Sequence, residues 1–186
     1  MSKKKLALVF ILILLGVGGV FLWQKNQKDV AELNKNLPDG IRVVKNLQGE
    51  YWVVNKIDGY EFKTPQGWKG IQEIKYTPER TEQGYTGTSI GITGKEGAGR
   101  LVGIDRFKIE DSGMDLETWA KTEFETLGLV GDFNKEKMEE IAVTKTQENV
   151  HLGGDYVYFF KQDYAIYAIM GGSEEFIREI ISSGKW

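Results

Sequence analysis

Cysteine is absent from this chain of 186 residues, and histidine occurs once, as His151. The lack of cysteine excludes a bacterial lipoprotein anchor, which needs a cysteine at its cleavage site, whereas a domain of this size needs no disulfide. A Ser-His-acid triad would have to use His151. The chain also has no N-x-S/T acceptor site for glycosylation, so nothing favours a eukaryotic secretory route, and we expect a bacterial protein.

None of the eighteen residues from Leu6 to Trp23 carries a charged side chain. At about 1.5 Å per residue, this run would form a helix of about 27 Å, enough to cross the hydrocarbon core of a bilayer. We predict that residues 1–28 are an N-terminal signal-anchor with its transmembrane helix at 6–23, so that the lipid bilayer is the partner of this segment. A cleaved signal peptide is the alternative, with a small-residue site at 16–19, although Trp23 suits a lipid–water interface.

The lysines around the apolar run predict its orientation. Lys3, Lys4 and Lys5 precede the run, and Lys25 and Lys28 follow it. The positive-inside bias therefore predicts a single-pass protein of the cell membrane, with a cytoplasmic N-terminus and residues 29–186 outside the cytoplasm.

The part of the chain from Asp29 onward is acidic, with 19 Lys and Arg against 27 Asp and Glu, a net charge of −8. That charge argues against binding to nucleic acid or to anionic lipid headgroups, which require basic surfaces. We expect residues 29–40 to be a polar stalk and residues 41–186 to form one exported domain.

Short apolar and aromatic runs predict a sheet-rich domain with two main helices. Asp115 and Ser173 are the expected N-caps of these helices, and Trp68, Trp119 and Phe176 are expected to be buried together or in adjacent layers. We expect a polar loop at 78–87 and a short helical turn at 132–140. The predicted strands are 41–44, 51–54, 60–63, 68–76, 88–93, 101–109, 141–146, 156–161 and 164–170, and the first helix is 116–127. This pattern predicts an α+β fold, a central antiparallel β-sheet flanked by helices.

One sequence fits a nucleophile elbow, because Gly87-Thr88-Ser89-Ile90-Gly91 reads G-x-S-x-G. The elbow needs a sharp turn from a strand into a helix, and here a strand pattern continues, which predicts an ordinary strand serine. The glycines at 94–99 do not have the spacing of a phosphate-binding loop, and Glu96 would place a negative charge against the phosphates. We therefore expect no catalytic residues and no enzyme activity.

Two features of the sequence leave alternatives open. His151, Glu148 and Asp155 could form a metal site for a divalent cation if their loop folds back, although no spacing signature supports it, and no other cofactor is expected. The aromatic hairpin at 156–170 is either core between helices on both faces or an exposed binding surface.

The segment Gly59-Tyr60-Glu61-Phe62-Lys63-Thr64-Pro65-Gln66-Gly67-Trp68 resembles the opening of PsbP-like domains, where a G-Y-x-F-x-x-P-x-G-W pattern is typical. The end of the chain is similar as well, with the strand at 164–170, then Gly171-Gly172-Ser173-Glu174-Glu175-Phe176, then Ile180-Ile181-Ser182-Ser183. The resemblance covers roughly residues 41–186, and Gly184-Lys185-Trp186 stands where the family has a short S-F-like tail.

The resemblance implies an α/β/α sandwich, the fold shared by PsbP and the Ran-binding Mog proteins. PsbP proteins are extrinsic photosystem II subunits that help to retain calcium and chloride. This chain has a predicted membrane anchor in place of a thylakoid transit sequence, and no motif matches a photosystem-binding region. Only the fold is therefore carried over, with the chain taken as a non-photosynthetic relative.

The sequence as a whole predicts a membrane-tethered, extracytoplasmic and non-catalytic domain that binds a protein or cell-envelope partner. The alternative is a cation-binding or small-molecule-binding accessory protein of the PsbP type.

Overall fold

The computed structural model describes residues 29–64, 71–82, 85–94, 100–110, 113–126, 132–138, 140–147, 156–171 and 173–186. The transmembrane helix predicted at 6–23 lies outside these residues. Within the described ranges, no helix combines the length and the apolar composition that a membrane span requires.

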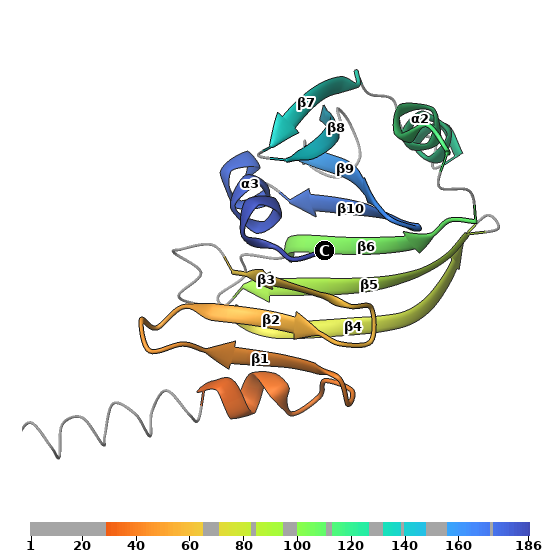
Figure 1. Cartoon of the computed structure of the whole chain (residues 1–186). Helices are drawn as coiled ribbons and strands as arrows, with labels where there is room; N and C mark the ends of the chain where they lie inside the picture. The colour runs from red at the N-terminus through yellow and green to blue at the C-terminus, as the bar shows by residue number, and fades with distance from the viewer. Residues whose placement is uncertain are drawn as a thin grey trace, which may run out of the picture.

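A seven-stranded antiparallel sheet has the strand order β4-β5-β6-β10-β9-β8-β7 (Figure 1). Strand β10 pairs with β6 on one side and β9 on the other, so a late segment of the chain joins the two halves of the sheet. The bounds are β4 Ile71–Glu82, β5 Tyr85–Gly94, β6 Arg100–Lys108, β7 Asn134–Met138, β8 Ile141–Gln147, β9 Tyr156–Gln162 and β10 Ala165–Gly171.

A smaller antiparallel sheet packs against one face of the large one. It contains β1 Ile41–Lys45, β2 Tyr51–Asn55 and β3 Tyr60–Lys63, and Figure 1 shows it in front of the β4–β5 half of the large sheet. Its inward side chains share one core cluster with the isoleucines of β4, β5 and β6. Helix α3 (Glu174–Ser183) packs on the same face, because Ile177, Ile180 and Ile181 belong to this cluster.

Helix α2 (Leu116–Thr126) packs on the opposite face of the large sheet. Trp119 and Ala120 form a second buried cluster with side chains of β6, β9 and β10, among them Phe159 and Ile166. The chain is thus a mixed α+β fold, built mostly from antiparallel sheet with a few helices.

Both expected N-caps are confirmed. The Asp115 carboxylate accepts a hydrogen bond from the backbone N–H of Thr118 at 2.9 Å, and the Ser173 hydroxyl accepts one from Phe176 at 3.4 Å. Trp119 and Phe176 pack against clusters on opposite faces of the sheet, with Trp119 buried and Phe176 partly buried. Trp68 lies outside the described residues.

The aromatic hairpin β9–β10 is core on both of its faces. Tyr158, Phe160 and Tyr167 face the small sheet and α3, whereas Val157 and Phe159 face α2. The side chains of β9 thus alternate between the two faces, as in a regular strand, and of the two alternatives for this hairpin the structure shows core. The predicted strands 156–161 and 164–170 place the turn at Gln162-Asp163. The observed turn is Asp163-Tyr164, one residue later, because Asp163 adopts φ +52° and Gln162 still pairs with Ala165. Tyr164 is consequently exposed at the turn.

Residues 29–40 differ from the expected polar stalk, because they dock on the domain. Residues 29–34 are helical and lie beside the free edge of β1 (Figure 1). The Asn34 amide donates to Val43 O at 2.9 Å and accepts from Val43 N at 2.6 Å, as a neighbouring strand would. Leu33 and Leu37 pack against the core cluster beneath the small sheet.

Two expected elements are wrong. The helical turn expected at 132–140 is mostly strand β7, whose pairing with β8 overrides the helix-compatible composition of Asn134–Met138. Most of the polar loop expected at 78–87 is also strand, because β4 and β5 continue as a long ribbon. Pro78 is accommodated where the register shifts between Thr77 and Arg80, next to Glu79 at φ +46°.

Candidate functional site

The residues of the predicted metal site, His151, Glu148 and Asp155, lie outside the described residues, so the structure places none of them. In the ranges that the structure does describe, no three His, Cys, Asp or Glu side chains come together in a way that could hold a metal ion. A cation site at 148–155 stays a prediction.

Ser89 lies in the middle of β5, where it is paired with Thr77 of β4 and Asp105 of β6. Strand β5 continues to Gly94 with no helix after Ser89, so the strand turn that would thrust a nucleophile outward is not formed here. The prediction of an ordinary strand serine is confirmed.

A cluster of buried and partly buried polar side chains lies between the two sheets, and we refer to it as the interface cluster. Its members are Asn55, Asp58, Tyr60, Tyr76, Arg106 and Tyr167. The β2–β3 turn directs the carboxylate of Asp58 inward. The Asn55 side chain accepts hydrogen bonds from the backbone N–H groups of Ile57 and Asp58, and it donates one to Asp58 Oδ2 at 2.7 Å. Gly59, at φ +84°, completes the turn, and the Asp58 side chain is only 5% exposed.

Arg106 of β6 is the cation of the interface cluster. Its Nη1 lies 3.9 Å from Asp58 Oδ1, and its Nε donates to the Tyr167 hydroxyl at 3.3 Å. Asp58 belongs to the small sheet, whereas Arg106 and Tyr167 belong to the large one. The ion pair therefore links the β2–β3 turn of the small sheet to the large sheet.

The electrostatics of the cluster favour a positioning role. Burial raises the pKa of Tyr60, of Tyr76 and of Tyr167, and the nearby Asp58 carboxylate acts in the same direction. The three hydroxyls therefore stay neutral at physiological pH, as hydrogen-bonding groups and not as bases. The cluster can hold the sheets in register, which is a different task from moving a proton.

A second polar network joins α3 to the β7–β9 edge. The Glu174 carboxylate forms ion pairs with Lys145 at 2.7 Å and with Arg178 at 2.9 Å, and it accepts a hydrogen bond from the Tyr158 hydroxyl at 2.8 Å. Arg178 also forms an ion pair with Glu136 at 2.7 Å. The Lys145 ammonium, followed by the Tyr158 hydroxyl, lowers the pKa of Glu174 to about 2. This network fixes the start of α3 on the sheet.

Apolar side chains reach the surface mainly around the small sheet. Among the described residues, the large hydrophobic side chains that are exposed are Leu47, Ile57 and Tyr164, and each lies in a hairpin turn. Val44, Trp52 and Val54 point to the outer face of the small sheet and are partly exposed. Neither core cluster includes these three.

Sequence reasoning missed the interface cluster, although a signal was present. Asp105 and Arg106 are adjacent charges inside the apolar strand β6, and the alternation of a strand sends them to opposite faces. A charge on each face of a buried strand indicates a polar partner in each layer.

A scan against protein-family models, a search of curated proteins and a search of solved structures each find no match for this chain. The resemblance to PsbP-like domains therefore stays a prediction from the residues quoted above.

Proposed function

We propose that residues 29–186 form a non-catalytic binding domain, held outside the cytoplasm by a membrane anchor at 6–23, that contacts a protein partner in the cell envelope. The observation that carries this proposal is the apolar outer face of the small sheet, formed by Val44, Trp52 and Val54. A tethered domain needs a contact surface that its own core does not use, and this face is the best candidate on the described residues.

The composition of this face resembles that of a protein interface. Trp52 lies opposite Val44 on β1 and Lys63 on β3, while Val54 lies between Arg42 and Glu61. An aromatic centre with charged residues at its margin is typical of surfaces that bind proteins, in which tryptophan and arginine contribute most of the affinity.

The rim charges are held in place by ion pairs. Lys63 contacts Glu50 at 2.7 Å and Glu179 at 3.6 Å, and Glu61 pairs with Lys185. A preorganised rim lowers the entropy lost on binding.

Site-specific photocrosslinking in the full-length, membrane-bound protein tests the proposal. A crosslinker at position 52 is expected to capture one defined partner, and the same crosslinker at Lys121, on the exposed side of α2, is not. With that partner purified, Trp52→Ala should weaken binding by about tenfold or more, whereas Lys121→Ala should leave it unchanged. Equal capture at the two positions, or equal affinity of the two variants, would contradict the proposal.

We also propose that the α+β fold is an α/β/α sandwich of the PsbP-like type. Two features support it: helices α2 and α3 pack on opposite faces of the central sheet, and Tyr60 and Phe62 of the G-Y-x-F motif are buried on β3. A crystal structure of the protein whose sheet and two helices fail to superpose on a PsbP domain would remove this part of the proposal.

A further inference from the structure

The β1–β2 turn presents a leucine that the fold does not use. Leu47 is fully exposed, with 103% relative accessibility, and it belongs to neither core cluster. The turn around it is well ordered by hydrogen bonds: Asn46 N donates to Glu50 O at 3.0 Å, Gly49 N donates to Asn46 O at 3.1 Å, and the Asn46 amide donates to Glu50 Oε2 at 2.6 Å. Leu47 is thus held away from the protein on a stable turn.

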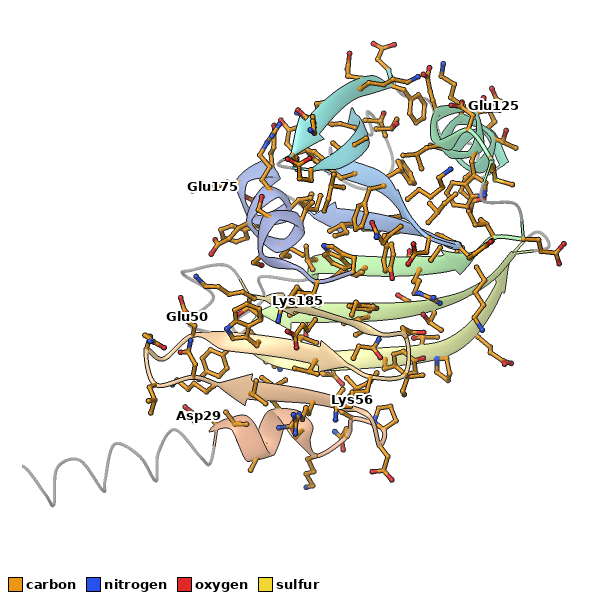
Figure 2. All side chains as sticks on the ribbon, in the orientation of Figure 1. Asp29, Glu50, Lys56, Glu125, Glu175 and Lys185 are labelled. Atoms are coloured by element: carbon orange, nitrogen blue, oxygen red, sulfur yellow. The ribbon has the colours of Figure 1, made fainter. Side chains whose placement is uncertain are left out.

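The point at which the chain enters the domain lies at the same end of the small sheet as this turn. Asn34, Leu33 and Leu37 fix residues 29–34 on the edge of β1, which sets the position of Asp29. Figure 2 shows Asp29 and Glu50 toward one end of the small sheet and Lys56, in the β2–β3 turn, toward the other.

The distance between this end of the domain and the bilayer is limited by chain length. Trp23 ends the apolar run, and only residues 24–28 separate it from Asp29. Six steps between Cα atoms span at most about 20 Å when fully extended, and much less when helical. If Trp23 lies at the membrane interface, the β1–β2 end of the domain is held next to the headgroups.

From these three observations we propose that Leu47, at the tip of the β1–β2 turn, inserts into the interface of the bilayer that holds the protein's own anchor. The inference rests on the proposed membrane anchor and adds an orientation: the small sheet stands with its β1–β2 end on the membrane. One leucine is too weak to bind a domain from solution, but the tether gives the contact a high effective concentration.

The side chains beside the tip suit an interfacial location. Lys45 lies with its ammonium 4.7 Å from the Tyr51 ring centroid and 3.2 Å from the Tyr51 hydroxyl, an arrangement of amphipathic groups common at the headgroup level. Lys63 pairs with Glu50, so the turn does not share the net negative charge of the domain. The contact is therefore apolar and does not require anionic lipid.

The absence of cysteine permits a clean test with a single fluorescent label on the full-length protein. Leu47→Cys and Ile57→Cys would each be labelled with an environment-sensitive dye and reconstituted into phosphatidylcholine vesicles that carry a lipid-linked quencher. Ile57 is the matched control, because it is also an exposed apolar residue in a turn of the small sheet, but at the opposite end.

We expect the label at position 47 to be blue-shifted and quenched roughly twofold or more relative to the label at position 57. If the protein floats with the vesicles and the two labels are quenched equally, the orientation is wrong while the anchor stands. If the protein does not float with the vesicles at all, the proposed anchor fails, and the orientation fails with it.

Discussion

At the scale of single residues, each face of the sheet depends on a tryptophan at the centre of an aromatic cluster. Trp119, on the α2 side, packs 5.1 Å from Phe107 and 6.2 Å from Phe159 between ring centroids. On the other side, Trp186 lies 5.0 Å from Phe160 and donates its indole N–H to Ile181 O at 3.2 Å. Such contacts add geometric specificity to the area that each ring buries.

The first prediction concerns Trp119, which is 3% exposed. Trp119→Ala leaves a cavity under α2 and should lower the free energy of unfolding by about 3–5 kcal/mol, measured by urea denaturation. Tyr164→Ala, at a turn where the ring is 63% exposed, is the control and should change stability by less than about 0.5 kcal/mol. Similar losses for the two variants would show that Trp119 is not a core residue.

A second prediction at this scale concerns pH and Glu174, whose pKa is lowered from 4.5 to about 2. A carboxylate with a lowered pKa stabilises the folded state fully above its unfolded pKa, and this contribution is lost as the pH falls toward 2. Because Glu174 is partly exposed and screened, Glu174→Gln should cost about 1 kcal/mol at pH 7.

The cost of Glu174→Gln should shrink between about pH 4.5 and pH 2, which denaturant titrations across this range would measure. Glu175→Gln is the matched control, since Glu175 lies in the same first turn of α3 but is exposed. The Glu175→Gln variant loses the same interaction with the helix dipole but keeps the polar network around Glu174. A cost for Glu174→Gln that does not vary with pH would contradict the assigned role.

At the scale of elements, the free edge of β1 is protected by hydrogen bonds from one side-chain amide, that of Asn34. Asn34→Ala removes both hydrogen bonds to Val43 and should cost about 1–2 kcal/mol, with faster hydrogen exchange at the Val43 amide. Asn36→Ala, on an exposed residue two positions later, should change neither quantity. Unchanged exchange at Val43 in the Asn34 variant would mean that residues 29–34 do not protect this edge.

Most elements could be predicted from the sequence, because their signals are local. Aromatic and β-branched runs indicated β1, β2, β3, β9 and β10, and the caps Asp115 and Ser173 located both helices. Strand β7 could not be predicted, because its polar sequence becomes a strand only through pairing with β8. The ribbon through Pro78 was missed for a related reason: the shift in register that accommodates the proline is a property of two strands.

For the interface cluster, the sequence signals that Arg106 needs a polar partner, but it cannot show which residue that partner is. The Asp58-Gly59 turn was recognisable, but its carboxylate meets Arg106 only because one sheet packs on the other. Which face of β6 meets the small sheet is decided by tertiary packing, about which a strand pattern carries no information.

At the scale of the whole molecule, the acidic domain leaves a cation-binding role as a second hypothesis. If residues 148–155 bind Ca²⁺, Mn²⁺ or Zn²⁺, the cation at roughly 100 times its Kd should add about 2.7 kcal/mol and raise the thermal midpoint by several degrees. His151→Ala should abolish the increase, whereas Ser89→Ala should leave it intact. Midpoints that do not move with any of the three cations would exclude the hypothesis.

The final prediction is the topology of the complete chain, on which both proposals depend. Three lysines before the apolar run, against Lys25 and Lys28 after it, predict that residues 29–186 lie outside the cytoplasm. Added protease should therefore digest the domain in intact spheroplasts, and the protein should remain in the membrane pellet after a carbonate wash, because a spanning helix leaves lipid only at a large cost. Replacing Leu12 and Leu14 by Arg would place two charges in the hydrocarbon, at about 2.5–3.5 kcal/mol each, and should release the protein from the pellet. Recovery of the unaltered protein from the cytosol after gentle lysis would refute the anchor, the compartment and the membrane orientation together.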